Sequence, residues 1–187
     1  IELIENGEGD NWVALLERLT ENKTAGTEVV APTTAISDGD SFTYGDTEVR
    51  IHHYGIAHTT SDVMIEFPAQ SITFLGDNVL YERIPRIDDG NIQGNIEACT
   101  RIRETGSKAY VPGHGKTGGD IVPASYCEYM TALYSAVKKY YDEGLSDFEM
   151  KDQVAGALSD WAGWSGFDEQ LGKHISLAYL QIEEAEF

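Results

Sequence analysis

Basic residues are scarce in this 187-residue chain, which has 13 lysines and arginines against 32 aspartates and glutamates and a formal net charge of −19. Nucleic-acid binding depends on Lys and Arg displacing counterions from the phosphate backbone, and so acidic a chain repels that backbone. We therefore expect no nucleic-acid partner and no anionic membrane surface as a partner. The acid excess is typical of a surface that favours solubility.

Long apolar runs and leader segments are also missing. No run reaches the ~20 residues that span a bilayer, and no signal peptide is visible. The sequence begins with Ile1 rather than Met, so we expect it to start inside a longer precursor, and the missing leader says nothing about export. A length of 187 residues suits a single domain.

Only two cysteines are present, Cys99 and Cys127. Two are too few for a disulfide framework, and they lack the spacing of a metal-binding pair. Both fall in segments that we expect to be helical, so we interpret them as small buried apolar residues. They do not decide between a cytoplasmic and a periplasmic location.

A series of short strands is predicted by the apolar and turn residues before position 115. Residues 42–44 and 48–51 flank a Gly45-Asp46 turn, which is typical of a β-hairpin. Three further runs are short, rich in β-branched or aromatic residues and bounded by Gly or Pro, and each predicts a strand: residues 63–67, 71–75 and 108–111. A loop over residues 81–94 is expected to shape a substrate pocket.

Helical spacing of apolar residues predicts helices over residues 12–19 and 95–104 and three more after residue 122. The first of these three carries a tyrosine-rich stripe from Tyr126 to Tyr141, which is more typical of a core face than of a ligand site. The second is expected to begin at Ser146, because Ser146 and Glu149 have the spacing of a capping box. The last presents one apolar face: Leu171, Ile175, Ala178 and Ile182. These elements together indicate an α/β fold.

Three potential metal ligands lie at the ends of the predicted strands, in a fixed order. Imidazole and carboxylate groups on loops that leave strand ends have the rigidity that a hydrolytic zinc site needs. The three candidate ligands are His58, Asp77 and His114. They occur in the strings His58-Thr59-Thr60-Ser61-Asp62, Phe74-Leu75-Gly76-Asp77 and Tyr110-Val111-Pro112-Gly113-His114-Gly115.

These strings resemble the third, fourth and fifth metal-binding motifs of the metallo-β-lactamase superfamily, which read His-Thr-x-Gly-Asp, Gly-Asp after a strand, and Pro-Gly-His-Gly. The resemblance implies that His58 binds a first zinc, that Asp77 bridges two zincs, and that His114 binds the second. It also implies the αβ/βα sandwich of that family, of which this chain is the C-terminal portion. Residues 122–187 would be a helical extension of the same domain. Ser61 departs from the family pattern, which usually has Gly there.

The family's first motif, His-x-His-x-Asp-His, is absent from the chain, which has five histidines. That motif supplies the remaining zinc ligands and the Asp that orients the attacking water. The adjacent pair His52 and His53 cannot replace it, because neighbouring side chains do not share one face of a strand. We interpret residues 1–187 as a single incomplete domain whose N-terminal half, or a second copy of the chain, is an expected partner.

The resemblance implies that the parent protein is a zinc-dependent hydrolase acting on a small molecule. Zinc lowers the pKa of its bound water to about 7, and the expected reaction is hydrolysis of an ester, thioester, amide or lactam bond. Neither zinc would find the three protein ligands of a catalytic site in this chain alone. We therefore expect the chain by itself to bind zinc weakly and to be inactive.

Within the superfamily, the glyoxalase II-like and quinoprotein-associated zinc hydrolases are the most similar in character, although residues 78–85 lack the Gly-Arg pair of the glyoxalase II branch. Two alternatives stay open. The chain is a non-catalytic binding or scaffold module that kept the fold, or the three motifs coincide in an unrelated α/β binding protein. We interpret His52, His53 and His174 as surface or hydrogen-bonded core residues.

Overall fold

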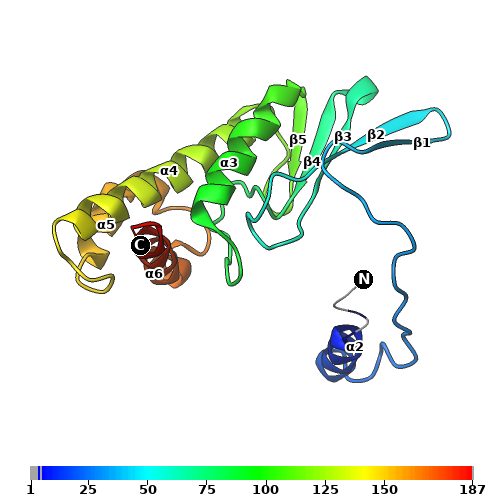
Figure 1. Ribbon diagram of the computed structural model, residues 1–187, viewed down its shortest axis with the longest axis horizontal. Coiled ribbons are helices and arrows are strands. Elements are labelled where there is room, and N and C mark those ends of the chain that lie inside the picture. The colour runs from blue at the N-terminus through cyan, green and yellow to red at the C-terminus, as the bar shows by residue number, and fades with distance from the viewer. Residues whose placement is uncertain (1–3, 5, 187) are drawn as a thin grey trace. The chain divides into compact units, whose positions relative to one another are not determined.

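A computed structural model describes the chain at Ile4 and from residue 6 to residue 186 (Figure 1). The chain divides into two units, Ile1–Ile36 and Ser37–Phe187. The first unit contains helix α2 (Glu8–Leu19), which has no buried residue and leaves Trp12 and Leu19 exposed. The helix predicted over residues 12–19 is confirmed. No helix among the described residues is long and apolar enough to cross a membrane.

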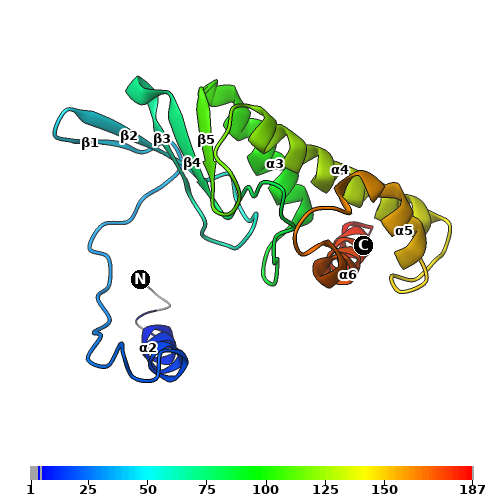
Figure 2. The same cartoon turned by 180° about the vertical axis from the view of Figure 1, so that it is seen from behind.

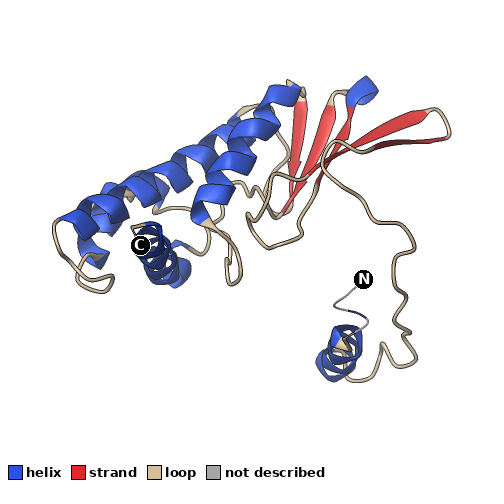
Figure 3. Ribbon diagram, in the orientation of Figure 1, coloured by secondary structure: helices blue, strands red, loops and turns tan. Residues whose placement is uncertain are grey.

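The second unit is built on a five-stranded sheet, whose strands are drawn in red in Figure 3 and labelled in Figure 1, with the order β1-β2-β3-β4-β5. The first four strands are antiparallel neighbours, whereas β5 runs parallel to β4. Their bounds lie within one residue of the predicted ones, so the hairpin and the three further strands are confirmed. The strands are β1 (Ser41–Tyr44), β2 (Thr47–His52), β3 (Met64–Phe67), β4 (Ile72–Gly76) and β5 (Ala109–Pro112), with the short helix η1 (Pro68–Gln70) between β3 and β4.

A parallel pair of strands needs a crossover, and helix α3 (Ile92–Ile102) with the short helix η2 (Arg103–Thr105) connects β4 to β5. The predicted helix is confirmed but begins three residues earlier than expected. The reason is Asn91, whose side-chain oxygen accepts a hydrogen bond from the Gly94 N–H at 2.8 Å. Asparagine is among the strongest N-cap residues, so the helix begins directly after it.

The C-terminal helices form a layer that extends from the sheet (Figures 1 and 2). Helix α4 (Ile121–Asp142) packs along α3 and then against α5 (Lys151–Ala157) and α6 (Phe167–Ala185), and the short helix η3 (Ser159–Trp161) joins the last two. The tyrosine-rich stripe is a core face, as predicted. Its buried members are Tyr126, Tyr129, Met130, Leu133 and Val137. The predicted apolar face of α6 is buried as well.

Helix α5 begins later than the sequence predicted. Ser146 and Glu149 do pair, since the Ser146 N–H and Oγ donate to Glu149 Oε2 at 3.0 and 2.6 Å. They close a turn, however, and the helix starts at Lys151. The Asp147 carboxylate accepts a hydrogen bond from Ser176 on α6, so a tertiary contact holds this turn.

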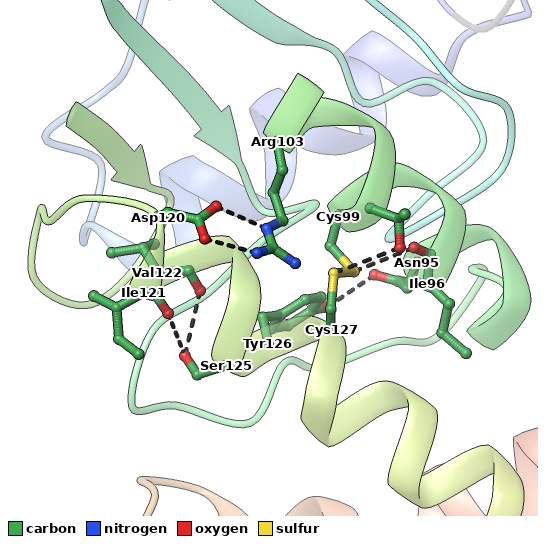
Figure 4. The surroundings of a disulfide bond; sticks show 11 residues. Asn95, Ile96, Cys99, Arg103, Asp120, Ile121, Val122, Ser125, Tyr126 and Cys127 are labelled. Carbon is green, nitrogen blue, oxygen red and sulfur yellow. Dashed lines mark hydrogen bonds and ion pairs between the residues drawn. A yellow bond between two sulfur atoms is a disulfide. The ribbon is translucent and has the colours of Figure 1, made fainter. Parts of the chain in front are cut away.

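The two cysteines form a disulfide that joins α3 to α4 (Figure 4). They are buried, as expected for small apolar residues, but they are also joined to each other, which the sequence did not predict. The two helices pack side by side and bring the Cα atoms of Cys99 and Cys127 to 5.7 Å. Two polar contacts flank the bridge. Tyr126 donates to Asn95 Oδ1 at 2.8 Å, and the Arg103 guanidinium donates to both oxygens of Asp120 at 2.7 and 2.6 Å.

The two faces of the sheet differ in burial. Register places Glu66, Thr73 and Tyr110 on one face, where all three are buried. The opposite face carries Phe67 and Phe74, whose rings pack edge to face at 5.7 Å. Phe74 is nevertheless 45% exposed, so this apolar face is covered incompletely by the described residues.

Candidate metal centre

Asp77 and His114 lie on adjacent loops that leave parallel strands. The carboxyl ends of β4 and β5 meet at one edge of the sheet, as parallel neighbours do. Gly76 pairs with Pro112, and the Gly113 N–H donates to the Gly76 carbonyl at 2.7 Å. As a result, Asp77 Oδ1 and His114 Nε2 are 3.7 Å apart.

That distance fits two ligands of one metal ion, because zinc bonds to carboxylate oxygen and imidazole nitrogen at about 2.0–2.2 Å. Both side chains are partly open to solvent, with 38% of Asp77 and 55% of His114 exposed. Gly113 makes the approach feasible, since a Cβ at that position would lie 2.0 Å from Asp77 Oδ1. The lack of space for a side chain therefore explains why glycine precedes His114.

His58 lies on the loop between β2 and β3, and Asn78 connects this loop to the segment after Asp77. The His58 N–H donates to Asn78 Oδ1 at 3.3 Å, and Asn78 Nδ2 donates to the Asp62 carbonyl at 3.4 Å. Sequence reasoning missed Asn78, which is only 2% exposed. Its place directly after the Gly-Asp string was the available signal, because a buried amide must find partners.

One ring nitrogen of His58 is orphaned. Nδ1 is buried and has no hydrogen-bond partner among the described residues. Asp62 Oδ2 is 3.6 Å away, beyond hydrogen-bonding distance, and it accepts a hydrogen bond from Thr59 Oγ1. An unsatisfied buried polar atom is unfavourable by about 1–3 kcal/mol, and this is the observation at His58 that fits a ligand role.

The three candidate ligands are only partly brought together. No group of three His, Cys, Asp or Glu side chains within the part of the chain that the structure describes is arranged to hold a metal ion. Asp77 and His114 form a close pair, whereas the contacts shown for His58 are with Asp62 and Asn78. The donor set therefore fits part of a zinc site, one ligand short of the three that a catalytic zinc uses.

His52 is hydrogen-bonded within the protein, in agreement with its interpretation from the sequence. Its Nε2 is 2.8 Å from Glu66 Oε2, and its Nδ1 is 2.9 Å from the Tyr54 hydroxyl. Burial raises the pKa of Tyr54 to about 12, although the Arg101 guanidinium, 4.0 Å above the ring, acts in the opposite direction. Tyr54 thus stays protonated. Because the Glu66 carboxylate can only accept, the hydrogen of the His52–Glu66 contact lies on His52 Nε2.

His174 is fully buried, and both of its ring nitrogens have partners. Nε2 donates to the Pro85 carbonyl at 3.0 Å, and Nδ1 accepts from the Tyr129 hydroxyl at 2.9 Å. It therefore anchors the loop after Asp77 instead of approaching the candidate ligands. The same loop reaches His114, whose carbonyl accepts from the Tyr81 N–H at 3.0 Å. The role of the loop over residues 81–94 in shaping a substrate pocket stays a prediction.

Comparison with known proteins assigns the fold. A scan of protein-family models and a search of curated proteins find no match. Among solved structures, the chain is similar to a metallo-β-lactamase from Pontibacter korlensis, with 21% identity, a TM-score of 0.50 and 63% of this chain covered. The metallo-β-lactamase IND-7 is similar at 19% identity, a TM-score of 0.50 and 55% coverage.

A third solved structure matches a larger share of this chain. The stereoselective inverting sec-alkylsulfatase Pisa1 from Pseudomonas sp. matches 82% of this chain, with 15% identity and a TM-score of 0.67. The chain has the metallo-β-lactamase fold, as its resemblance to that superfamily predicted. It spans 55% and 49% of the two metallo-β-lactamases and 27% of the alkylsulfatase.

Proposed function

We propose that the complete protein is a zinc-dependent hydrolase of the metallo-β-lactamase superfamily. The observation that carries the proposal is the 3.7 Å approach of Asp77 and His114 at the ends of parallel strands, within a fold shared with metallo-β-lactamases. His58 would hold a first zinc, His114 a second, and Asp77 both. Bound zinc would supply a water with a pKa of about 7.

The remaining ligands, and the Asp that orients the water, would come from outside these 187 residues. Two features support this part of the proposal. The matched metallo-β-lactamases are about twice as long as the segment they share with this chain. The apolar sheet face around Phe74 is also left partly exposed. We infer that the isolated chain binds zinc weakly and does not catalyse hydrolysis.

The substrate class that fits best is a small molecule with an ester, thioester, amide or lactam bond. A net charge of −19 is unfavourable for polynucleotides and for anionic membranes. The likeness to a sec-alkylsulfatase over most of this chain adds sulfate esters to the compounds that should be screened.

Zinc content per chain tests the proposal. We expect about two zincs in the complete protein and almost none in the 187-residue chain, because the chain alone lacks a third ligand for either ion. Elemental analysis of both purified forms gives the answer. In the complete protein, His114→Ala should remove one zinc and lower hydrolysis at least 100-fold, whereas His53→Ala should change neither. Absence of zinc from the complete protein would contradict the proposal.

A non-catalytic binding or scaffold module is the second candidate. The observation that favours it is that no three His, Cys, Asp or Glu side chains in the described part of the chain are arranged to hold a metal ion. In that case His58 and His114 serve only structure. Their substitution by Ala would then lower the melting temperature and leave the metal content of the complete protein unchanged.

A further inference from the structure

We propose that the start of α3 shapes the loop that carries His58, and that Gly90 and Gly94 are the positioning residues. The inference rests on the proposed ligand role of His58, because it explains how that side chain is held in place. Gly90 and Gly94 lie outside the three segments that contain His58, Asp77 and His114.

Both glycines touch the backbone of the His58 loop. A Cβ at Gly94 would lie 1.7 Å from the Ile56 carbonyl oxygen, and one at Gly90 would lie 2.2 Å from the Ala57 oxygen and 2.5 Å from the His58 oxygen. A backbone oxygen cannot turn away as the end of a flexible side chain can. Any larger residue would therefore displace the loop itself.

Backbone conformation does not explain these glycines. Neither Gly90 nor Gly94 is among the positive-φ residues of the chain, so an L-residue could adopt either backbone geometry. Gly94 also lies inside α3, where glycine is a much poorer helix former than alanine. The close approach to residues 56–58 is the remaining physical reason for glycine at these sites.

Hydrogen bonds fasten the loop to the same surface. The Asn91 N–H donates to the Ala57 carbonyl at 2.8 Å, while the Asn91 side chain caps α3. From α6, Gln181 accepts from the Ile92 N–H at 2.9 Å and donates to the Gly90 carbonyl at 3.2 Å. The segment that contacts the loop is therefore held from a second helix.

Gly94→Ala would require position 94 and the Ile56 carbonyl to separate by more than 1 Å, since a Cβ atom essentially never comes within 3.0 Å of another atom and this one would lie at 1.7 Å. His58 is only two residues further along the chain. Functional sites need their groups within about 0.5 Å of the productive position. We therefore expect displacement of the His58 loop to weaken metal binding before other properties change.

The experiment compares Gly94→Ala with Gly172→Ala in the complete protein. Gly172 lies in α6, where a Cβ would have nothing within 4 Å, so it is a matched helical glycine. Gly94→Ala should weaken zinc binding about 10- to 100-fold, the range seen when the supporting contacts of a ligand are lost. Gly172→Ala should leave zinc affinity unchanged and keep or raise the melting temperature.

Hydrogen exchange of the zinc-free complete protein gives a readout independent of metal. Gly94→Ala should accelerate exchange at residues 55–63 and at the Asn91 amide, and Gly172→Ala should not. If wild type binds no zinc but this acceleration occurs, the proposed function fails and the positioning role of α3 stands. Unchanged exchange and unchanged zinc affinity in Gly94→Ala would overturn the inference.

A second variant covers the case in which Gly94→Ala does not fold. Gln181→Met keeps the length of the side chain and removes both hydrogen bonds to the Gly90–Ile92 segment. It should speed exchange at residues 55–63 and weaken zinc binding by a few-fold. Exchange and zinc affinity equal to those of wild type would count against the inference.

Discussion

Reduction of the Cys99–Cys127 disulfide should lower the free energy of unfolding by about 3–4 kcal/mol. The two cysteines are 28 residues apart in the sequence, and a cross-link over that distance removes conformational entropy from the unfolded chain. For a protein of this size, such a loss should lower the melting temperature by roughly 10 °C.

Thermal unfolding with and without a reductant measures this effect, and thiol counting after denaturation checks the bridge. The control is the double variant Cys99→Ala and Cys127→Ala, which should melt at the lower temperature under both conditions. Two free thiols in the unreduced protein would mean that the bridge does not form. Since disulfides persist mainly in oxidising compartments, we also expect full stability only after oxidative production.

The sheet was predictable because each strand carries its own local signals. The Gly45-Asp46 turn marks the hairpin, and β-branched or aromatic residues between glycines and prolines mark β3, β4 and β5. Their bounds came within one residue of the structure. These signals depend on neighbours in the sequence, so they need no knowledge of tertiary contacts.

The features that escaped prediction depend on contacts between segments far apart in the sequence. Cys99 and Cys127 face each other only because α3 packs on α4. The late start of α5 follows a hydrogen bond from Ser176 to Asp147. No spacing rule reports such pairs, because helix packing and not local propensity brings them together.

The candidate site lies between these two cases. The resemblance to the metallo-β-lactamase superfamily, and not a spacing rule, suggested that Asp77 and His114 share a site. The structure brings them close because the ends of the parallel strands β4 and β5 meet at one sheet edge. His58 is on a loop between antiparallel strands, whose path depends on the packing of Gly90 and Gly94 against it. Its place as a zinc ligand, like those of Asp77 and His114, stays a prediction for zinc analysis to test.

Acid should destabilise the protein through His174. Burial lowers the pKa of His174 to about 4, and the positive charge of Lys173 acts in the same direction, while the hydrogen bond to Pro85 opposes them. The unfolded chain takes up the proton near pH 6.5, whereas the folded protein does so only near pH 4. Stability from this residue is therefore complete above pH 6.5 and is lost as the pH falls toward 4.

The loss amounts to about 1.4 kcal/mol per pH unit within that window, or about 2 kcal/mol by pH 5. Denaturant unfolding at pH 7 and pH 5 measures it, and His174→Gln is the control because an amide does not titrate there. The variant should be less stable at pH 7, since Tyr129 and Pro85 lose the imidazole between them, but its decline toward pH 5 should be shallower. Equal declines in the two proteins would show that folding does not lower the pKa of His174.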